Sequence, residues 1–98
     1  MTQQPIVLIN AFEVPDGQDD DFLDRWQRAA DALRSQPGYL STRLHRSLAP
    51  DADFRFVNVA RWESPESFRA ATSAPGFRQV AMPYRFHPAL YRVVREDG

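Results

Sequence analysis

The order of strand-like and helix-like segments constrains the fold of this 98-residue chain more than any other feature. Runs of β-branched and aromatic residues predict strands, and apolar residues spaced three and four apart predict amphipathic helices. Turn signals with proline or glycine separate the segments. The predicted strands span residues 5–14, 39–48, 53–62 and 85–95, and the predicted helices begin at 19 and 64, with a further turn at 77–82.

Local signals predict where the helices begin. Three aspartates at 19–21 place negative charge in the first turn of the first helix, where the helix dipole favours it. Ser64, Pro65 and Glu66 supply an N-cap serine, a proline at the first helical position and an acid behind it. A proline-glycine pair at 75–76 interrupts this second, short helix.

The resulting order is strand, helix, strand, strand, helix, strand, which is the ferredoxin-like arrangement of the α+β class. We predict a single domain over residues 1–98, with an antiparallel sheet and helices on one face. The other face needs cover, and so short a chain buries an incomplete core by itself. A second copy is the simplest cover, so we expect a homodimer.

Composition argues against several classes of protein. The formal charge of −1 and the pI near 6.1 provide no basic surface for nucleic acid. The chain has no cysteine, so it forms no disulfide framework. No apolar run approaches the roughly 20 residues of a membrane helix, and no leader pattern follows Met1. We expect a soluble, cytoplasmic protein without a membrane partner.

Familiar catalytic motifs are also missing from the sequence. The glycines at 17, 38, 76 and 98 form no phosphate-binding loop and no dinucleotide fingerprint. Two isolated histidines have no compact neighbours of the kind that bind a metal, and no serine stands in a nucleophile-elbow pattern. We therefore expect neither a nucleotide cofactor nor a metal.

The predicted strand at 53–62 has the most informative pattern. Alternation places Phe56, Asn58, Ala60 and Trp62 on one face, which combines apolar bulk with polar hydrogen bonders. Asn58 and Trp62 are suited to holding an oxygenated aromatic molecule. The structural alternative is that the asparagine satisfies a neighbouring backbone group and the tryptophan belongs to the core.

Three other polar residues are candidates for the same site, and a second histidine is not. His45, in the neighbouring strand, has the chemistry for proton transfer, and Asn10 is a polar group in an apolar strand that needs a partner. Arg78 could stabilise an anion, although a solvated helix arginine is the default interpretation. His87, beside a proline, is interpreted as a capping or surface group.

Two motifs resemble those of a known family. The segment VNVARWES at 57–64, followed by PESF from 65, fits the strand-to-helix pattern N-x-A-x-W-x-S of antibiotic biosynthesis monooxygenases. Upstream, PGYLS at 37–41 is similar to the family's entry into its second strand. With the matching order of elements, the resemblance covers nearly the whole chain and implies a dimeric α+β barrel.

The resemblance also implies an activity and a set of site residues. Members that tailor polyketides in antibiotic biosynthesis oxidise anthrones or related phenols to quinones with O₂, without metal, flavin or haem. Their site asparagine, tryptophan, histidine and arginine correspond to Asn58, Trp62, His45 and Arg78. The sequence departs at Phe68, where the quinone-forming members have a tyrosine, so one hydrogen-bond donor is absent.

Haem-degrading members of the superfamily provide a second comparison. Asn10 and Trp62 match two of their site positions. The histidine of those members would fall near Ala81, where this chain has no ligand for iron. We therefore rank haem degradation below quinone formation.

The leading hypothesis is a cofactor-independent monooxygenase acting with O₂ on a polycyclic phenol or anthrone. Asn58 and Trp62 would bond the substrate oxygens, His45 would assist proton transfer and Arg78 would favour the anion. The alternative hypotheses are a non-catalytic ligand-binding or assembly module of a biosynthetic pathway and a haem-degrading relative. Further residues predicted to bind the substrate are Asn10, Phe12, Phe22, Trp26, Phe56 and Phe68.

Overall fold

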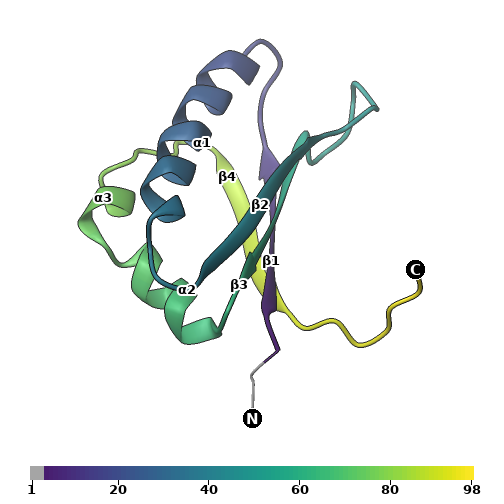
Figure 1. Cartoon of the computed structure of the whole chain (residues 1–98). Helices are drawn as coiled ribbons and strands as arrows, with labels where there is room; N and C mark the ends of the chain where they lie inside the picture. Colours follow the sequence, from purple (N-terminus) through teal and green to yellow (C-terminus); the bar gives the residue numbers. More distant parts are fainter. Residues whose placement is uncertain (1–3) are drawn as a thin grey trace.

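The computed structural model describes residues 4–98 and shows a four-stranded antiparallel sheet with helices on one face (Figure 1). The strand order is β2–β3–β1–β4, so β1 and β3 are central. The prediction of a ferredoxin-like α+β fold is confirmed. In chain order the elements are β1 (Ile6–Glu13), α1 (Asp19–Arg34), β2 (Tyr39–Arg46), β3 (Phe56–Trp62), α2 (Pro65–Thr72), α3 (Pro75–Arg78) and β4 (Arg85–Tyr91).

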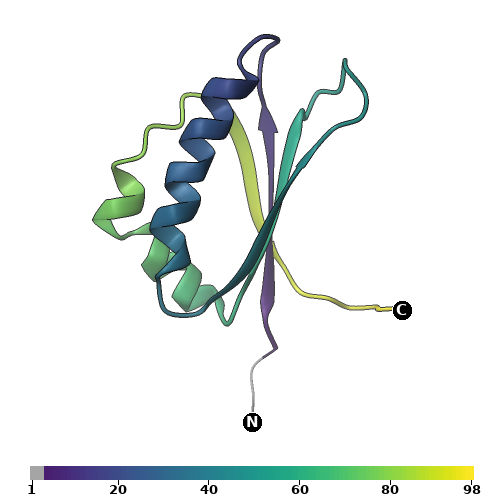
Figure 2. The ribbon, with the colours of Figure 1, turned by 45° about the horizontal axis from the view of Figure 1, so that its top comes forward.

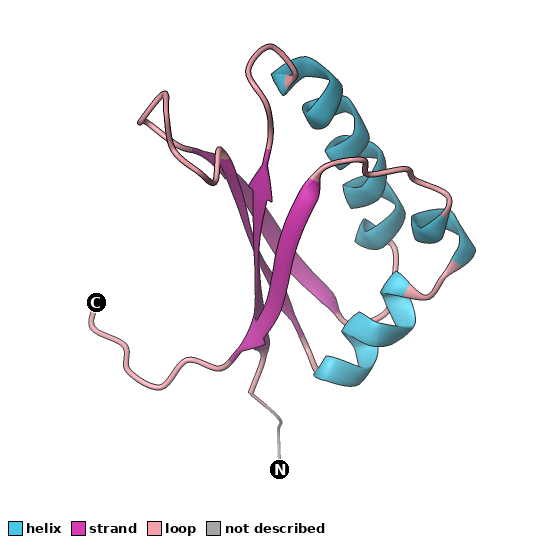
Figure 3. Ribbon diagram, turned by 180° about the vertical axis from the view of Figure 1, so that it is seen from behind, coloured by secondary structure: helices cyan, strands magenta, loops and turns pink. Residues whose placement is uncertain are grey.

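The structure corrects several predicted boundaries; β2 ends at Arg46 rather than 48, and the larger differences are the following. β3 begins at Phe56 rather than 53, because the chain before it forms the hairpin loop closed by the bond from Ser47 N to Arg55 O at 2.8 Å. The turn predicted at 77–82 is instead the helix α3 (Pro75–Arg78), since Pro75 suits a first helical position. β4 ends at Tyr91 rather than 95, and the chain beyond it leaves the sheet (Figure 3).

The start of α2 is fixed by the capping box that the sequence predicts in part. Ser64 Oγ accepts a hydrogen bond from Ser67 N at 3.1 Å, and Ser67 Oγ accepts one from Ser64 N at 3.2 Å. Gly38, with φ of +88°, packs against this cap, and a Cβ at this position would lie 2.4 Å from Ser67 Cβ. Only glycine therefore fits at position 38, where the connection between α1 and β2 packs against the first turn of α2.

All three helices of the described chain cover the same face of the sheet, and the other face is left open (Figure 2). Helix α1 is held at its first turn by a bidentate ion pair, in which Arg55 Nε and Nη2 lie 2.7 and 2.8 Å from the carboxylate of Asp19. Its buried Phe22 faces the sheet. Within residues 4–98, no helix is long and apolar enough to cross a membrane.

The core between sheet and helices is divided into two hydrophobic clusters. At one end of the strands the first cluster is formed by Ile6, Leu8, Ala60, Trp62 and Ala71. At the other end the second cluster is formed by Phe12, Val14, Phe22, Phe56 and Tyr84. Between them, Asn10 of β1 lies directly opposite Asn58 of β3. The middle of the helix-facing side of the sheet is therefore polar, and both ends are apolar.

Candidate functional site

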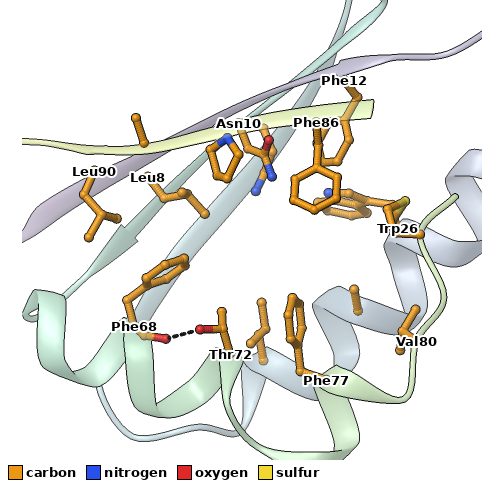
Figure 4. Close-up of a pocket in the computed structure, with 16 residues that line it drawn as sticks. Leu8, Asn10, Phe12, Trp26, Phe68, Thr72, Phe77, Val80, Phe86 and Leu90 are labelled. Atoms are coloured by element: carbon orange, nitrogen blue, oxygen red, sulfur yellow. Dashed lines mark hydrogen bonds between the residues drawn. The ribbon is translucent and has the colours of Figure 1, made fainter. Parts of the chain in front are cut away.

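A cavity of about 400 Å³ lies at this polar middle, between the sheet and the helices (Figure 4). The wall formed by the sheet includes Asn10, Asn58 and Phe86, and the opposite wall includes Trp26 of α1 and Phe77 of α3. Figure 4 shows Asn10 between Leu8 and Phe86, across the cavity from Thr72 and Phe77. This volume is in the range of small-molecule sites, roughly 300–1,000 Å³.

The walls of the cavity are apolar apart from a few groups. None of the 16 lining residues is an acid, a base, a histidine, a tyrosine or a cysteine. The polar groups are the two carboxamides, the Thr72 hydroxyl and the indole of Trp26. The Thr72 hydroxyl donates to Phe68 O at 3.0 Å within α2. Such a cavity suits a flat apolar molecule that carries oxygen acceptors at one edge.

Asn58 is 9% exposed, and its Oδ1 accepts a hydrogen bond from the Thr42 hydroxyl at 2.6 Å. Because Thr42 belongs to β2, the amide oxygen points to that side of β3 and Nδ2 points to the other side, towards β1. Among residues 4–98, Asn58 Nδ2 has no hydrogen-bond partner. Every fully buried side-chain nitrogen of the same residues does have a partner, so Asn58 Nδ2 is not fully buried. The amide N–H bonds of Asn58 are therefore accessible from the cavity.

Asn10 has the mirror-image arrangement. Its Oδ1 accepts a hydrogen bond from the backbone N of His87 in β4 at 3.1 Å. A backbone N–H only donates, so the amide oxygen must face β4, and Nδ2 is left on the side of β3. The two carboxamides, on directly paired residues, thus direct their oxygens outwards and their nitrogens towards the boundary between β1 and β3.

Of the predicted substrate-binding residues, the structure brings Asn10, Phe12, Trp26 and Phe68 to the cavity together with Asn58. Phe77, Phe86 and Met82 also line the cavity, although the sequence did not predict them as substrate-binding residues. Phe86 and Leu90 lie on the helix-facing side of β4, four residues apart. The two-residue period of that strand could therefore have predicted that both face the cavity.

Two predicted wall residues and one predicted catalytic residue lie instead in the core. Phe22 is 0% and Phe56 1% exposed, and their rings stack at 4.6 Å between centroids. Trp62 is 1% exposed and makes edge-to-face contacts with Tyr39 at 5.5 Å and Phe68 at 5.7 Å. Trp62 does not line the cavity but supports Phe68, which does.

His45 and Arg78 also lie outside the cavity. The side chain of His45 is exposed on the open face of the sheet, where Nδ1 lies 3.1 Å from Val57 O. The reason is a register shift between Tyr39 and Ser41, which reverses the faces of all later residues of β2. Arg78 is exposed at the end of α3. Neither residue is placed to touch a molecule in the cavity.

The segment after α3, which supplies Val80 and Met82 to the cavity, is tied to α1 by a polar cluster. Tyr84 donates to Asp21 Oδ2 at 2.5 Å, and Arg25 bonds both Asp21 Oδ2 at 2.9 Å and Ala81 O at 3.2 Å. The Tyr84 hydrogen bond, followed by that of Arg25, lowers the pKa of Asp21. The same bond, followed by burial, raises the pKa of Tyr84.

The chain is similar to known oxygenases in sequence. The model of the family described as antibiotic biosynthesis monooxygenase matches residues 5–82. A heme oxygenase (mycobilin-producing) of Mycobacterium tuberculosis is 37% identical over 71 residues, which are 72% of this chain and 66% of that protein. The chain thus matches just under two thirds of the length of this relative.

Solved structures share the fold as well. A candidate monooxygenase from Shewanella loihica PV-4 is 35% identical with a TM-score of 0.87, covering 98% of this chain and 100% of that one. SnoaB, a cofactor-independent oxygenase from Streptomyces nogalater, is 26% identical with a TM-score of 0.77, covering 94% of this chain and 95% of that one.

Proposed function

The chain belongs to the antibiotic biosynthesis monooxygenase family, and we propose that it is a cofactor-independent monooxygenase that oxidises a polycyclic phenol or anthrone to a quinone with O₂. The observation that supports this most directly is the apolar cavity with the amide nitrogens of Asn10 and Asn58 at its centre. Two N–H donors in an apolar setting stabilise negative charge on a substrate oxygen.

The proposed reaction needs only the substrate and O₂. Loss of a proton from the CH₂ group of an anthrone gives an anion whose charge lies on the carbonyl oxygen. The anion reacts with O₂ and, on taking up a proton, becomes a hydroperoxide at the former CH₂ carbon. Loss of water from this hydroperoxide forms the second carbonyl of the quinone. The substrate supplies the electrons that reduce one oxygen atom to water, so no external reductant is required.

The described cavity lining contains no base to accept the first proton. We therefore assign proton transfer to water rather than to His45, which lies on the opposite face of the sheet. The two amides would act by lowering the pKa of the bound substrate, because they hydrogen-bond its anion more strongly than its neutral form. Trp62 would act by holding Phe68 against the substrate.

The first test is O₂ uptake by metal-stripped protein with a panel of anthrones and hydroquinones, with quinone absorbance recorded against the spontaneous reaction. We expect turnover, and a loss of roughly 10²-fold in kcat for Asn58→Ala, the size of effect seen when one oxyanion donor is removed. A matched control is Gln79→Ala, which removes an exposed carboxamide outside the cavity and leaves kcat unchanged.

Absence of turnover across the panel would contradict the enzymatic proposal. A pure binding module would still bind these molecules, and the two tryptophans distinguish this case. Trp26 lines the cavity, whereas Trp62 is buried beside it. A Trp62→Phe variant, which keeps Trp26, should therefore show strong quenching by an aromatic ligand, and a Trp26→Phe variant should show much less. Quenching without turnover would favour the binding module.

Haem degradation is the activity in the name of one relative, but the cavity does not fit this group. Haem iron is held in proteins mainly by histidine, cysteine, methionine or tyrosine. Among the described lining residues Met82 is the one member of that set, and Val80 and Ala81 precede it where haem-degrading relatives would have a histidine. We expect titration with hemin to give no Soret band of a ligated haem protein.

We extend the proposal to a homodimer formed through the open face of the sheet. The centre of that face carries Val7, Ile9, Val57 and Val59, which remain half-exposed in the isolated chain. Covering them would bury apolar surface that the helices do not reach. Light scattering should give twice the mass of the chain, and Val59→Arg should halve it. A monomeric parent protein at micromolar concentration would contradict this part of the proposal.

A further inference from the structure

We propose that Thr42 is a positioning residue that holds the Asn58 carboxamide with its nitrogen towards the cavity, so that the centre of the cavity presents donors only. This inference rests on the proposed function and specifies the form of the substrate that the cavity selects. The selected ligand is a polycyclic aromatic molecule whose contacting oxygen is a pure acceptor, either a carbonyl or an ionised phenol. A phenol that keeps its proton is disfavoured.

The contact between Thr42 and Asn58 supports the direction of this hydrogen bond. Thr42 pairs with Ala60 and Asn58 with Leu44, so the two side chains meet diagonally on the helix-facing side of β2 and β3. The Oγ1–Oδ1 separation of 2.6 Å falls in the range of O–H···O bonds and is short for an N–H···O bond. The hydroxyl therefore donates, and the amide oxygen is the acceptor.

The neighbouring asparagine explains why this direction matters. Asn10 and Asn58 are direct partners across β1 and β3, where side chains are within reach of one another. If Asn58 were turned over, its oxygen could accept a bond from Nδ2 of Asn10, and the two amides would satisfy each other. In the structure the Thr42 hydroxyl instead donates to the oxygen of Asn58 and keeps that oxygen turned away from Asn10, and the N–H of His87 donates in the same way to the oxygen of Asn10.

Two donors without an acceptor between them select the protonation state of the ligand. A carbonyl or phenolate oxygen can accept from both amides, and charge makes such bonds roughly twice as strong. The hydrogen of a phenol would instead meet an N–H, with no acceptor in the described lining at that point. Thr42 thereby favours the substrate as the anion that reacts with O₂.

The test uses 2-hydroxyanthraquinone, a tricyclic dye whose absorbance reports ionisation of its phenol. Bound to the parent protein, the dye should ionise at least one pH unit lower than in water, which corresponds to about tenfold tighter binding of its anion. Thr42→Val keeps the shape of the side chain but removes the hydroxyl, and should abolish most of this shift. Thr42→Ser restores a hydroxyl and should recover it.

Ser41→Ala is the matched control, because it removes a hydroxyl from the adjacent position of β2, after the register shift, and should leave the dye's ionisation unchanged. Thermal unfolding of each variant shows that it is folded. If Asn58→Ala loses the shift but Thr42→Val keeps it, the positioning role of Thr42 is overturned while the proposed function stands. If the parent protein binds the dye without any shift, the donor site itself is wrong. Failure of the parent protein to bind the dye overturns both proposals.

Discussion

On the helix-facing side of the sheet, the two ends and the middle differ in side-chain packing. At one end, Trp62 of β3 is almost completely buried in the first cluster, and at the other end Phe56 of β3 is almost completely buried in the second. In the middle, the paired Asn10 and Asn58 face a cavity of about 400 Å³. A well-packed cluster therefore lies on each side of the incompletely packed middle. The two clusters stabilise the fold, so a small protein can contain a binding cavity.

Stability and ligand chemistry are therefore separated along the strands of this protein. Substitutions in the clusters should act mainly on the free energy of unfolding. Substitutions at the middle should act mainly on ligands, because an asparagine at a cavity contributes little apolar burial. Single substitutions in the clusters and at the middle can test this separation.

The largest effect is expected for Phe22→Ala. Phe22 is 0% exposed and contacts the rings of Phe12, Phe56 and Tyr84 at centroid distances of 4.9, 4.6 and 5.5 Å. Truncation should lower the free energy of unfolding by about 3–5 kcal/mol, measured by urea denaturation. Leu48→Ala is the control, because Leu48 is 101% exposed and should change stability by less than about 0.5 kcal/mol. A cost below about 1 kcal/mol for Phe22→Ala would mean that this end of the core is not well packed.

The next largest effect on the free energy of unfolding is expected when Asn58, which separates the two apolar clusters, is replaced by an apolar residue. Asn58→Leu alone leaves the half-buried hydroxyl of Thr42 without its acceptor and should cost about 1–3 kcal/mol. Adding Thr42→Val removes that hydroxyl, so the double variant should recover most of the loss while binding no dye. Urea denaturation of the single and double variants gives the coupling energy. Strict additivity would contradict the hydrogen bond between these two residues.

A smaller effect is expected from acid at the Asp21–Tyr84 contact, which holds the segment of Val80 and Met82 over the cavity. The pKa of Asp21 is lowered in the folded protein, so its contribution is complete above the pKa of the unfolded chain and is lost as pH falls through the folded value. Stability should therefore decline below about pH 4 in the parent protein and less steeply in Asp21→Asn. Identical pH profiles would mean that this contact does not stabilise the segment.

Alkaline titration tests the other partner of the same contact. The pKa of Tyr84 is raised, so its contribution is present below the unfolded value and is lost as pH rises through the folded one. Ultraviolet difference spectra should show one tyrosine ionising later than the rest in the parent protein. Tyr84→Phe should remove this late step, and a persistent late step would assign it to another tyrosine.

The smallest effect on stability is expected for Phe68→Tyr, which restores the tyrosine of the quinone-forming relatives that the sequence resembles. Phe68 lines the cavity and is only partly buried, so a hydroxyl can be accommodated at a cost within about 1 kcal/mol. The added donor should change the preference among hydroxylated anthrones in the O₂-uptake assay. An unchanged substrate ranking would show that position 68 does not touch the reacting edge of the substrate.

The sequence alone was sufficient for the order of elements, the capping at Ser64 and the placement of Asn58 on the same side of β3 as Phe56 and Trp62. Each of these depends on short-range rules, either the period of a strand or the chemistry of a helix start. The same rules could not tell a cavity-lining aromatic from a core aromatic. Phe12 and Phe22 are both apolar and inward, and the tertiary packing of α1 decided that one reaches the cavity and the other does not.

The residues that tertiary structure alone placed are those after the register shift in β2. Regular alternation from Tyr39, which packs on Trp62, would turn His45 to the same side and Thr42 to the other. The irregularity between Tyr39 and Ser41 exchanges the faces of these two residues. His45 therefore lies on the open face, and Thr42 lies on the helix-facing side, where it bonds Asn58. A bulge is set by strand pairing, which involves residues far apart in the chain, and a local pattern cannot reveal it.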